Sequence, residues 1–175
     1  MIETWAERLA ITIKNANEKE TVSVQVLKYA LTIVFNFLIP YSLALLIGWL
    51  TGMFFETLLA AFSLIAVRAS SGGYHFRSTI ACTIVTTIVS VLPPHIQMSS
   101  DWTTYLTAIG FVLFALYAPA NIQGYARMPE KYFPVMKWIS VIIAGSNFFI
   151  ESPIIALILL LQGVSLLIPN KEVKS

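Results

Sequence analysis

The stretch YALTIVFNFLIPYSLALLIGWL, residues 29–50, decides the fold because its 22 residues include no charged side chain. A helix needs about 20 apolar residues to cross a bilayer core about 30 Å thick. The whole chain of 175 residues is 57% apolar and 11% charged, with a mean hydropathy of +0.77. Soluble domains carry roughly 25% charged residues. The composition therefore excludes an ordinary soluble domain and predicts an integral membrane protein.

Five further apolar segments follow the first, and turn residues separate them. Thr51-Gly52 and Pro93-Pro94 end segments, while Ser152-Pro153 is an N-cap followed by proline at the first helical position. Pro40 is expected to kink the first segment, since proline removes a backbone donor. The predicted spans are 29–50, 53–67, 79–93, 102–120, 132–150 and 153–169. We therefore expect an all-α fold in which residues 1–175 form a single domain, a polytopic membrane helix bundle with six transmembrane segments.

The N-terminal segment, residues 1–27, differs from the spans because charged residues interrupt it. Its apolar side chains recur at helical spacing: Ile2, Trp5, Leu9 and Ile13. This pattern predicts an amphipathic helix lying in the membrane interface, although a helix packed on its own bundle fits the pattern equally well. Val22, Val24 and Val26 alternate like a strand, but the alternation is brief and leads directly into the first span, so we expect helix there.

The basic residues fall on one side of this segmentation. Ten of the eleven precede the first span, follow the sixth, or lie in the connections 68–78 and 121–131, whereas Asp101 and Glu151 lie in the other connections. Cytoplasmic loops carry an excess of Lys and Arg. The pattern predicts a multi-pass protein of the cell membrane with both termini and these two loops in the cytoplasm.

The polar insert RASSGGYHFRSTIAC, residues 68–82, holds most of the reactive side chains. It contains the only cysteine, one of the two histidines, two arginines and a glycine pair. Gly72-Gly73 breaks a helix, and a helix starting at an N-cap of Ser78 or Thr79 places Cys82 in its first turn. The positive end of that helix dipole favours the nucleophilic thiolate. With His75 on the preceding loop, thiolate and imidazole form a nucleophile–base pair.

Other interpretations of the same residues remain open. A lone cysteine in a membrane helix is usually a packing residue, and a lone histidine in a polar loop is often solvated. A serine dyad of Ser70 or Ser71 with His75 is a second enzymatic alternative. A non-enzymatic membrane protein, such as a transporter or channel subunit, is the alternative to an enzyme, but only Glu56 and Lys137 are charged within the predicted spans.

Several classes of site are excluded or disfavoured. A net charge of +2 without a basic block argues against a nucleic-acid partner, and one cysteine excludes an internal disulfide and multi-cysteine zinc sites. No glutamate adjoins either histidine, as His-Glu-x-x-His metalloproteases require, and Asp101 is the only aspartate, which excludes an aspartyl dyad. We expect neither a metal nor a cofactor.

The spacing Arg68, Gly73, His75 and Cys82 resembles the motif of the AgrB family, the membrane cysteine peptidases that process quorum-sensing propeptides. The six-segment layout and the stretch Tyr117-Ala-Pro-Ala120 are similar too. The resemblance implies Cys82 as nucleophile and His75 as general base, with Arg68 and Gly73 shaping the site. It implies a precursor peptide that is cleaved and probably cyclised to a thiolactone or lactone.

The resemblance also implies partners. They are the lipid bilayer and a precursor with an acidic C-terminal tail, which the basic residues Arg77, Arg127 and Lys131 would suit; a second copy of the chain is a further candidate. Topology alone explains those charges equally well. Family members tend to carry a lysine-rich stretch after Tyr-Ala-Pro-Ala, whereas this chain has only Arg127 and Lys131 there. If those lysines serve ring closure or recognition of the tail, we expect this chain to process a different precursor or to cleave without cyclising.

Overall fold

The protein is described by a computed structural model that covers residues 2–16, 22–74, 76, 78–121 and 129–169. These residues form seven α-helices and two short 3₁₀ helices, and a single isolated β-bridge joins Gly72 to Ala120. The helices are α1 (Ile2–Ala16), α2 (Val24–Leu50), α3 (Phe54–Ser71), α4 (Thr79–Val91), η1 (Pro93–His95), α5 (Ser100–Tyr117), η2 (Glu130–Tyr132), α6 (Phe133–Ile150) and α7 (Pro153–Leu167). The expected all-α class is confirmed for the described part of the chain.

Three of these helices, α2, α3 and α6, are long and apolar enough to cross a membrane, and α7 and the region Thr79–His95 are shorter apolar helices. The alternating valines begin α2, as expected, rather than a strand. Four predicted segments end elsewhere: 102–120 ends as α-helix at Tyr117, 153–169 ends at Leu167, and the other two are 53–67 and 79–93. The segment 53–67 continues as helix to Ser71, because Ser70 and Ser71 are buried against the bundle. The segment 79–93 ends as α-helix at Val91, and Pro93 starts η1 instead.

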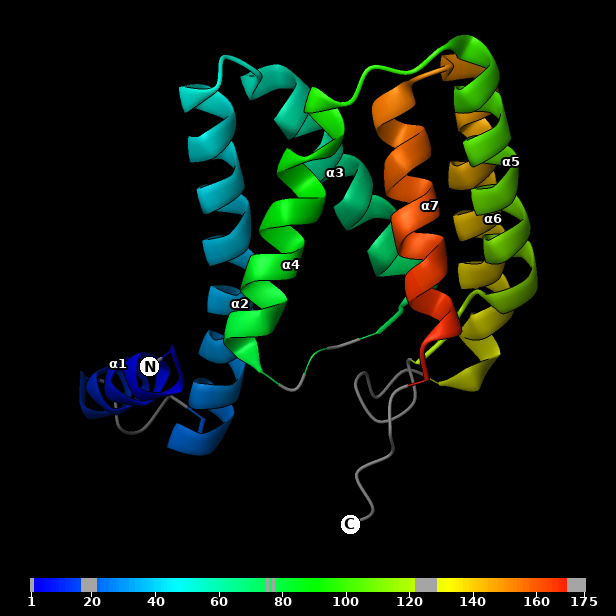
Figure 1. The fold of residues 1–175 in the computed structure, drawn as a ribbon. Coiled ribbons are helices and arrows are strands. Elements are labelled where there is room, and N and C mark those ends of the chain that lie inside the picture. The colour runs from blue at the N-terminus through cyan, green and yellow to red at the C-terminus, as the bar shows by residue number, and fades with distance from the viewer. Residues whose placement is uncertain (1, 17–21, 75, 77, 122–128, 170–175) are drawn as a thin grey trace. The chain divides into compact units, whose positions relative to one another are not determined.

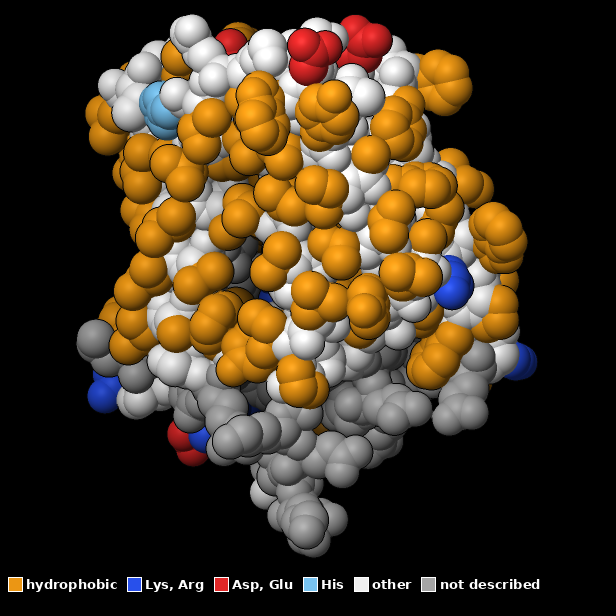
Figure 2. Space-filling view, turned by 45° about the vertical axis from the view of Figure 1, so that its right-hand side comes forward, with side chains coloured by type: hydrophobic (Ala, Val, Ile, Leu, Met, Phe, Trp, Pro, Cys, Tyr) orange, Lys and Arg blue, Asp and Glu red, His pale blue; other side chains and the backbone are white. Residues whose placement is uncertain are grey.

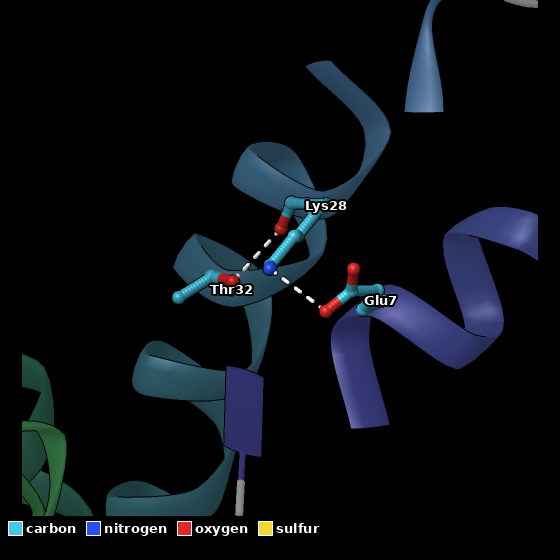
Figure 3. Close-up of polar contacts among 3 residues, drawn as sticks. All are labelled: Glu7, Lys28 and Thr32. Atoms are coloured by element: carbon cyan, nitrogen blue, oxygen red, sulfur yellow. Dashed lines mark hydrogen bonds and ion pairs between the residues drawn. The ribbon is translucent and has the colours of Figure 1, made fainter. Parts of the chain in front are cut away.

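The described chain divides into two compact units, which are treated separately: residues 1–43 with 76–87, and residues 44–75 with 88–175. The first unit contains α1. In this helix Ala6 and Ala10 are fully buried, whereas Trp5 is 69% exposed. The ammonium group of Lys28 on α2 lies 2.9 Å from a carboxylate oxygen of Glu7 on α1 (Figure 3). One ion pair thus links α1 to α2, and the larger apolar side chain of Trp5 faces outward.

The second unit is a bundle of α3, α5, α6 and α7. Helix α5 packs against both α6 and α7, and α3 packs against the same two helices (Figure 1). Glycines allow α5 and α7 to come close. A Cβ atom on Gly110 would lie 2.9 Å from the Cβ atom of Leu159, and one on Gly163 would lie 2.9 Å from Cδ1 of Leu113. Small residues at helix contacts are typical of membrane bundles.

A buried asparagine fixes the turn between α6 and α7. The Asn147 side-chain amide donates to Thr107 Oγ1 at 2.8 Å and to the Ser152 carbonyl at 3.1 Å, and its oxygen accepts from the Ser152 backbone N–H at 3.1 Å. Glu151 in this turn is left-handed, with φ 54°. The Ser152 hydroxyl caps α7 by accepting from the N–H of Ile155, as the sequence predicted.

Charged side chains of the second unit lie at opposite ends of its helices. Asp101 is in the first turn of α5, and Glu151 follows the last residue of α6. Lys131 precedes α6, and Arg68 is in the last turn of α3. Figure 2 shows acidic side chains at the upper edge of the visible face and hydrophobic side chains over its middle. This arrangement is the one that the charge pattern of the sequence leads us to expect.

Candidate active site

The chain leaves α3 through the glycine pair that the sequence predicted to break the helix. Gly72 has φ 72° and Gly73 has φ 116°, both in the region that favours glycine. The Gly72 N–H donates to the Arg68 carbonyl at 3.0 Å and so closes the last turn. The backbone then extends toward Tyr74, which is bonded directly to His75.

The segment that follows Tyr117 pairs with this extended backbone. The Gly73 N–H donates to the Ala120 carbonyl at 2.9 Å, and the Ala120 N–H donates to the Ser71 carbonyl at 2.9 Å. These two bonds form the parallel bridge between Gly72 and Ala120. Ala120, the last residue of the stretch quoted above for its resemblance, therefore lies against the glycine pair.

Helix α7 binds the same backbone through the side chain of Gln162. The Gln162 amide donates to the Gly72 carbonyl at 2.7 Å and to Ser71 Oγ at 3.3 Å. A Cβ atom on Gly73 would lie 2.7 Å from Ser165 Oγ and 2.8 Å from Gln162 Nε2. Because real Cβ atoms do not come so near, only glycine fits here without movement of its neighbours.

Arg68 contacts Tyr74, the residue that precedes His75. Its guanidinium group donates to the Tyr74 carbonyl at 2.8 Å, which spans the glycine turn from the last turn of α3. A hydrogen bond from a charged donor is worth about 1.5–3 kcal/mol. Arg68 and Gly73 thus both contact or form the backbone that leads to His75. His75 itself lies outside the described residues, together with Arg77 and Arg127, so their predicted roles stay predictions.

Cys82 lies in the first turn of α4, as expected from the sequence. Ser78 is the N-cap: its hydroxyl accepts from the Ala81 N–H at 3.4 Å, and its carbonyl accepts from the Cys82 N–H at 3.0 Å. The cysteine is free, and its side chain is half-buried. A thiol in this position is near the N–H groups that begin a helix, where negative charge is stabilised.

The serine alternative loses support from the geometry. Ser71 is fully buried, and its hydroxyl accepts from Gln162. Ser70 is 6% exposed, and its hydroxyl bonds to the carbonyls of Ala66 and Val67 in its own helix. A nucleophile needs an accessible oxygen and a base beside it. Both hydroxyls are instead hydrogen-bonded within the bundle, Ser71 to Gln162 and Ser70 to carbonyls of its own helix.

The remaining candidates lie at separate places. Lys131 is exposed, with its ammonium group 5.1 Å from the centre of the Tyr132 ring. Asn121, which follows the bridge residue Ala120, donates from its side-chain amide to the Ile168 carbonyl at 2.9 Å. Within the described ranges, no group of three His, Cys, Asp or Glu side chains could hold a metal ion.

Sequence reasoning missed Gln162. It is the only amide side chain between Pro153 and Pro169, an otherwise apolar stretch, and it is 2% exposed. Polar residues in apolar spans are costly and often functional. That rule singles out Gln162 as a residue of interest, although it does not reveal its partners.

Comparison with known proteins gives a consistent result. The chain matches the family described as Accessory gene regulator B over residues 3–168. It is 30% identical to the Accessory gene regulator protein B of Staphylococcus carnosus, over 87% of this chain and 81% of that protein. Putative AgrB-like proteins of Halalkalibacterium halodurans and Listeria monocytogenes are each 28% identical; the matches cover 95% and 85% of this chain and 87% and 68% of those proteins. No solved structure matches.

Proposed function

Because the chain belongs to the Accessory gene regulator B family, we propose that it is an integral-membrane cysteine endopeptidase that cleaves, and helps to cyclise, a precursor signalling peptide. The observation that carries the proposal is the hydrogen-bonded backbone before His75. The Arg68 guanidinium group donates to the Tyr74 carbonyl, and the Gly73 N–H donates to the Ala120 carbonyl, so both residues that precede this imidazole in the chain are held. These two attachments support a loop that positions a side chain rather than one that only connects two helices.

The chemistry begins at sulfur. The Cys82 thiolate attacks a peptide carbonyl, and backbone N–H groups at the start of α4 stabilise the charge that develops on its oxygen. The carbon–nitrogen bond then breaks, and His75 donates a proton to the departing amine. The C-terminal part of the precursor leaves, and its N-terminal part remains on Cys82 as a thioester.

The fate of the thioester decides the product. Water attacking the thioester carbon gives a linear acid, whereas a cysteine or serine side chain within the bound peptide gives a thiolactone or lactone. In both cases His75 takes the proton of the attacking group, the bond to Cys82 breaks, and the thiolate and the protonated imidazole return. A site near the membrane excludes most water, so the ring-closing attack is favoured when the peptide holds its own nucleophile close to the thioester.

The substrate suggested by the charges is a peptide with an acidic C-terminal tail. The charge pattern of the sequence assigns Arg77, Arg127 and Lys131 to the proposed cytoplasmic side, which would also carry the site, and Lys131 is exposed. Opposite charge raises the rate of encounter and lowers the affinity for wrong partners. These three residues are proposed as contacts for the tail.

The proposal includes the position of the protein in the membrane. Six crossings with both termini in the cytoplasm would place Arg68, Lys131 and the His75–Cys82 segment on the inner side and Asp101 and Glu151 on the outer side. The segregation of these charges at opposite ends of the second unit supports this orientation.

The test is processing of a precursor encoded beside the gene, co-expressed with the chain and followed by mass spectrometry. Wild type should release the C-terminal tail, and Cys82→Ala and His75→Ala should each release none. Ser70→Ala is the matched control, because its hydroxyl bonds only to helix carbonyls; it should process normally. With purified protein, hydroxylamine should free the peptide from a thioester on Cys82.

Two results would refute the proposal. The first is continued processing by the Cys82→Ala variant, since no other side chain of the chain can form a thioester. The second is loss of processing in Ser70→Ala with Cys82→Ala active, which would return the nucleophile to serine.

A further inference from the structure

Gln162 is the described residue whose environment the proposed chemistry does not yet explain. It lies on α7, 2% exposed, and its amide donates to two acceptors of the α3 C-terminus, the Gly72 carbonyl and Ser71 Oγ. The separations along the sequence are 90 and 91 residues. The two bonds therefore fix the glycine turn to a helix far away in the chain.

The chemistry of the side chain matches its place. Burying an amide is unfavourable unless its N–H groups find acceptors. The Gln162 Nε2 atom donates to two of them, Ser71 Oγ and the Gly72 carbonyl. A methionine or leucine at this position would fill the space without that requirement. Helix packing alone thus gives no reason for an amide here.

The Gly72 carbonyl, which Gln162 binds, belongs to the turn that leads the chain to His75. Gly72 and Gly73 both have positive φ, and glycine has more conformations available than any other residue. Left alone, such a pair would let the following residues occupy many positions. Gln162 binds the carbonyl of the first glycine, while the Ala120 carbonyl binds the N–H of the second.

We propose that Gln162 is a positioning residue for His75: through the Gly72 carbonyl it restricts the glycine turn and thereby holds the imidazole where it can exchange a proton. The inference rests on the proposed function. A general base must lie within hydrogen-bond reach of its proton, and a displacement of about 1 Å can lower a rate about 100-fold. Ser71 supplies the second acceptor and is a weaker contributor, since its bond to Gln162 is longer.

The experiment uses the full chain in lipid vesicles and a synthetic precursor. Gln162→Met keeps the volume and removes the donor, and we expect kcat to fall at least tenfold with KM within threefold of wild type. Alkylation of Cys82 by iodoacetamide should stay at the wild-type rate, because the thiol lies on α4. Gln97→Met is the control, an exposed glutamine of the connection before α5, and should leave kcat unchanged.

The readouts separate positioning from general support of the fold. A variant that merely folds less well would give less folded protein, with kcat per folded molecule unchanged, and that result overturns the inference. An unchanged kcat, or a change in KM alone, also overturns it. Where Gln162→Met gives little folded protein, Gln162→Leu also lacks the donor and carries the same expectation.

Failure of this inference is distinguishable from failure of the proposed function. If Cys82→Ala still processes the precursor, the peptidase proposal fails whatever Gln162 does. If Cys82→Ala is inactive and Gln162→Met turns over normally, only the role of Gln162 is refuted.

Discussion

Replacing Gly73 by alanine should impair the site, and the structure gives the size of the effect. The backbone at this residue has φ 116°, and a side chain in the left-handed region costs about 1–2 kcal/mol. The new Cβ atom would also lie 2.7 Å from Ser165 Oγ and 2.8 Å from Gln162 Nε2; moving Gln162 away breaks its bond to the Gly72 carbonyl, and leaving such a polar group unpaired costs about 1–3 kcal/mol. The smallest sum, about 2 kcal/mol, makes the native turn roughly 30-fold less populated, at about 1.4 kcal/mol per factor of ten.

The assay is turnover of the precursor per folded molecule, with the fold monitored by thermal unfolding in detergent. Gly52→Ala is the matched control: Gly52 also has positive φ, at 75°, but nothing lies within 4 Å of an added Cβ atom. It should lower the free energy of unfolding by about 1 kcal/mol and leave turnover unchanged. Turnover of Gly73→Ala within threefold of wild type would refute the reasoning, because the turn would then tolerate both the strain and the overlap.

Three further predictions concern other contacts. Arg68→Ala removes the charged donor to the Tyr74 carbonyl and should lower kcat about 10- to 100-fold. In the same assay Arg68→Lys should recover part of the lost kcat. An equal loss in both variants would contradict a role for the charge. Asn147→Ala leaves the polar atoms of the α6–α7 turn unpaired and should lower the free energy of unfolding by about 1–3 kcal/mol without changing turnover of the folded protein. In a Cys82→Ser background, a membrane-impermeant maleimide applied to intact cells should label Asp101→Cys but not Lys131→Cys, and the reverse labelling would overturn the proposed orientation.

The helices could be predicted from the sequence because membrane helices are defined by local composition. Apolar length, the N-cap Ser152 and the glycine of the Thr51-Gly52 turn each signal a boundary within a few residues, and the structure has helix ends near them. The error at Val67 has a physical reason. Polar residues usually mark a loop, but Ser70 satisfies its hydroxyl on its own helix carbonyls, so the helix continues.

The support of the site could be predicted only in part. Gly72 and Gly73 announce a turn by their identity, and the structure gives both positive φ. The sequence around their partners gives no indication that these residues contact the turn. Ala120 and Gln162 meet the turn across separations of tens of residues, and a single sequence does not state which distant residues come together.

The two halves of the proposed dyad depend on different local structures, and this makes their contributions separable. The backbone before His75 is held by contacts from α3, α7 and the residues after α5, so variants of Arg68, Gly73 or Gln162 act on the base. The thiol depends on the first turn of α4, which Ser78 caps. Ser78→Ala should therefore change the alkylation rate of Cys82, whereas variants around the glycine turn should change turnover and leave alkylation alone. If variants of both kinds changed both quantities equally, the loop and the helix start would be one structural element, and the assignment of separate roles would fail.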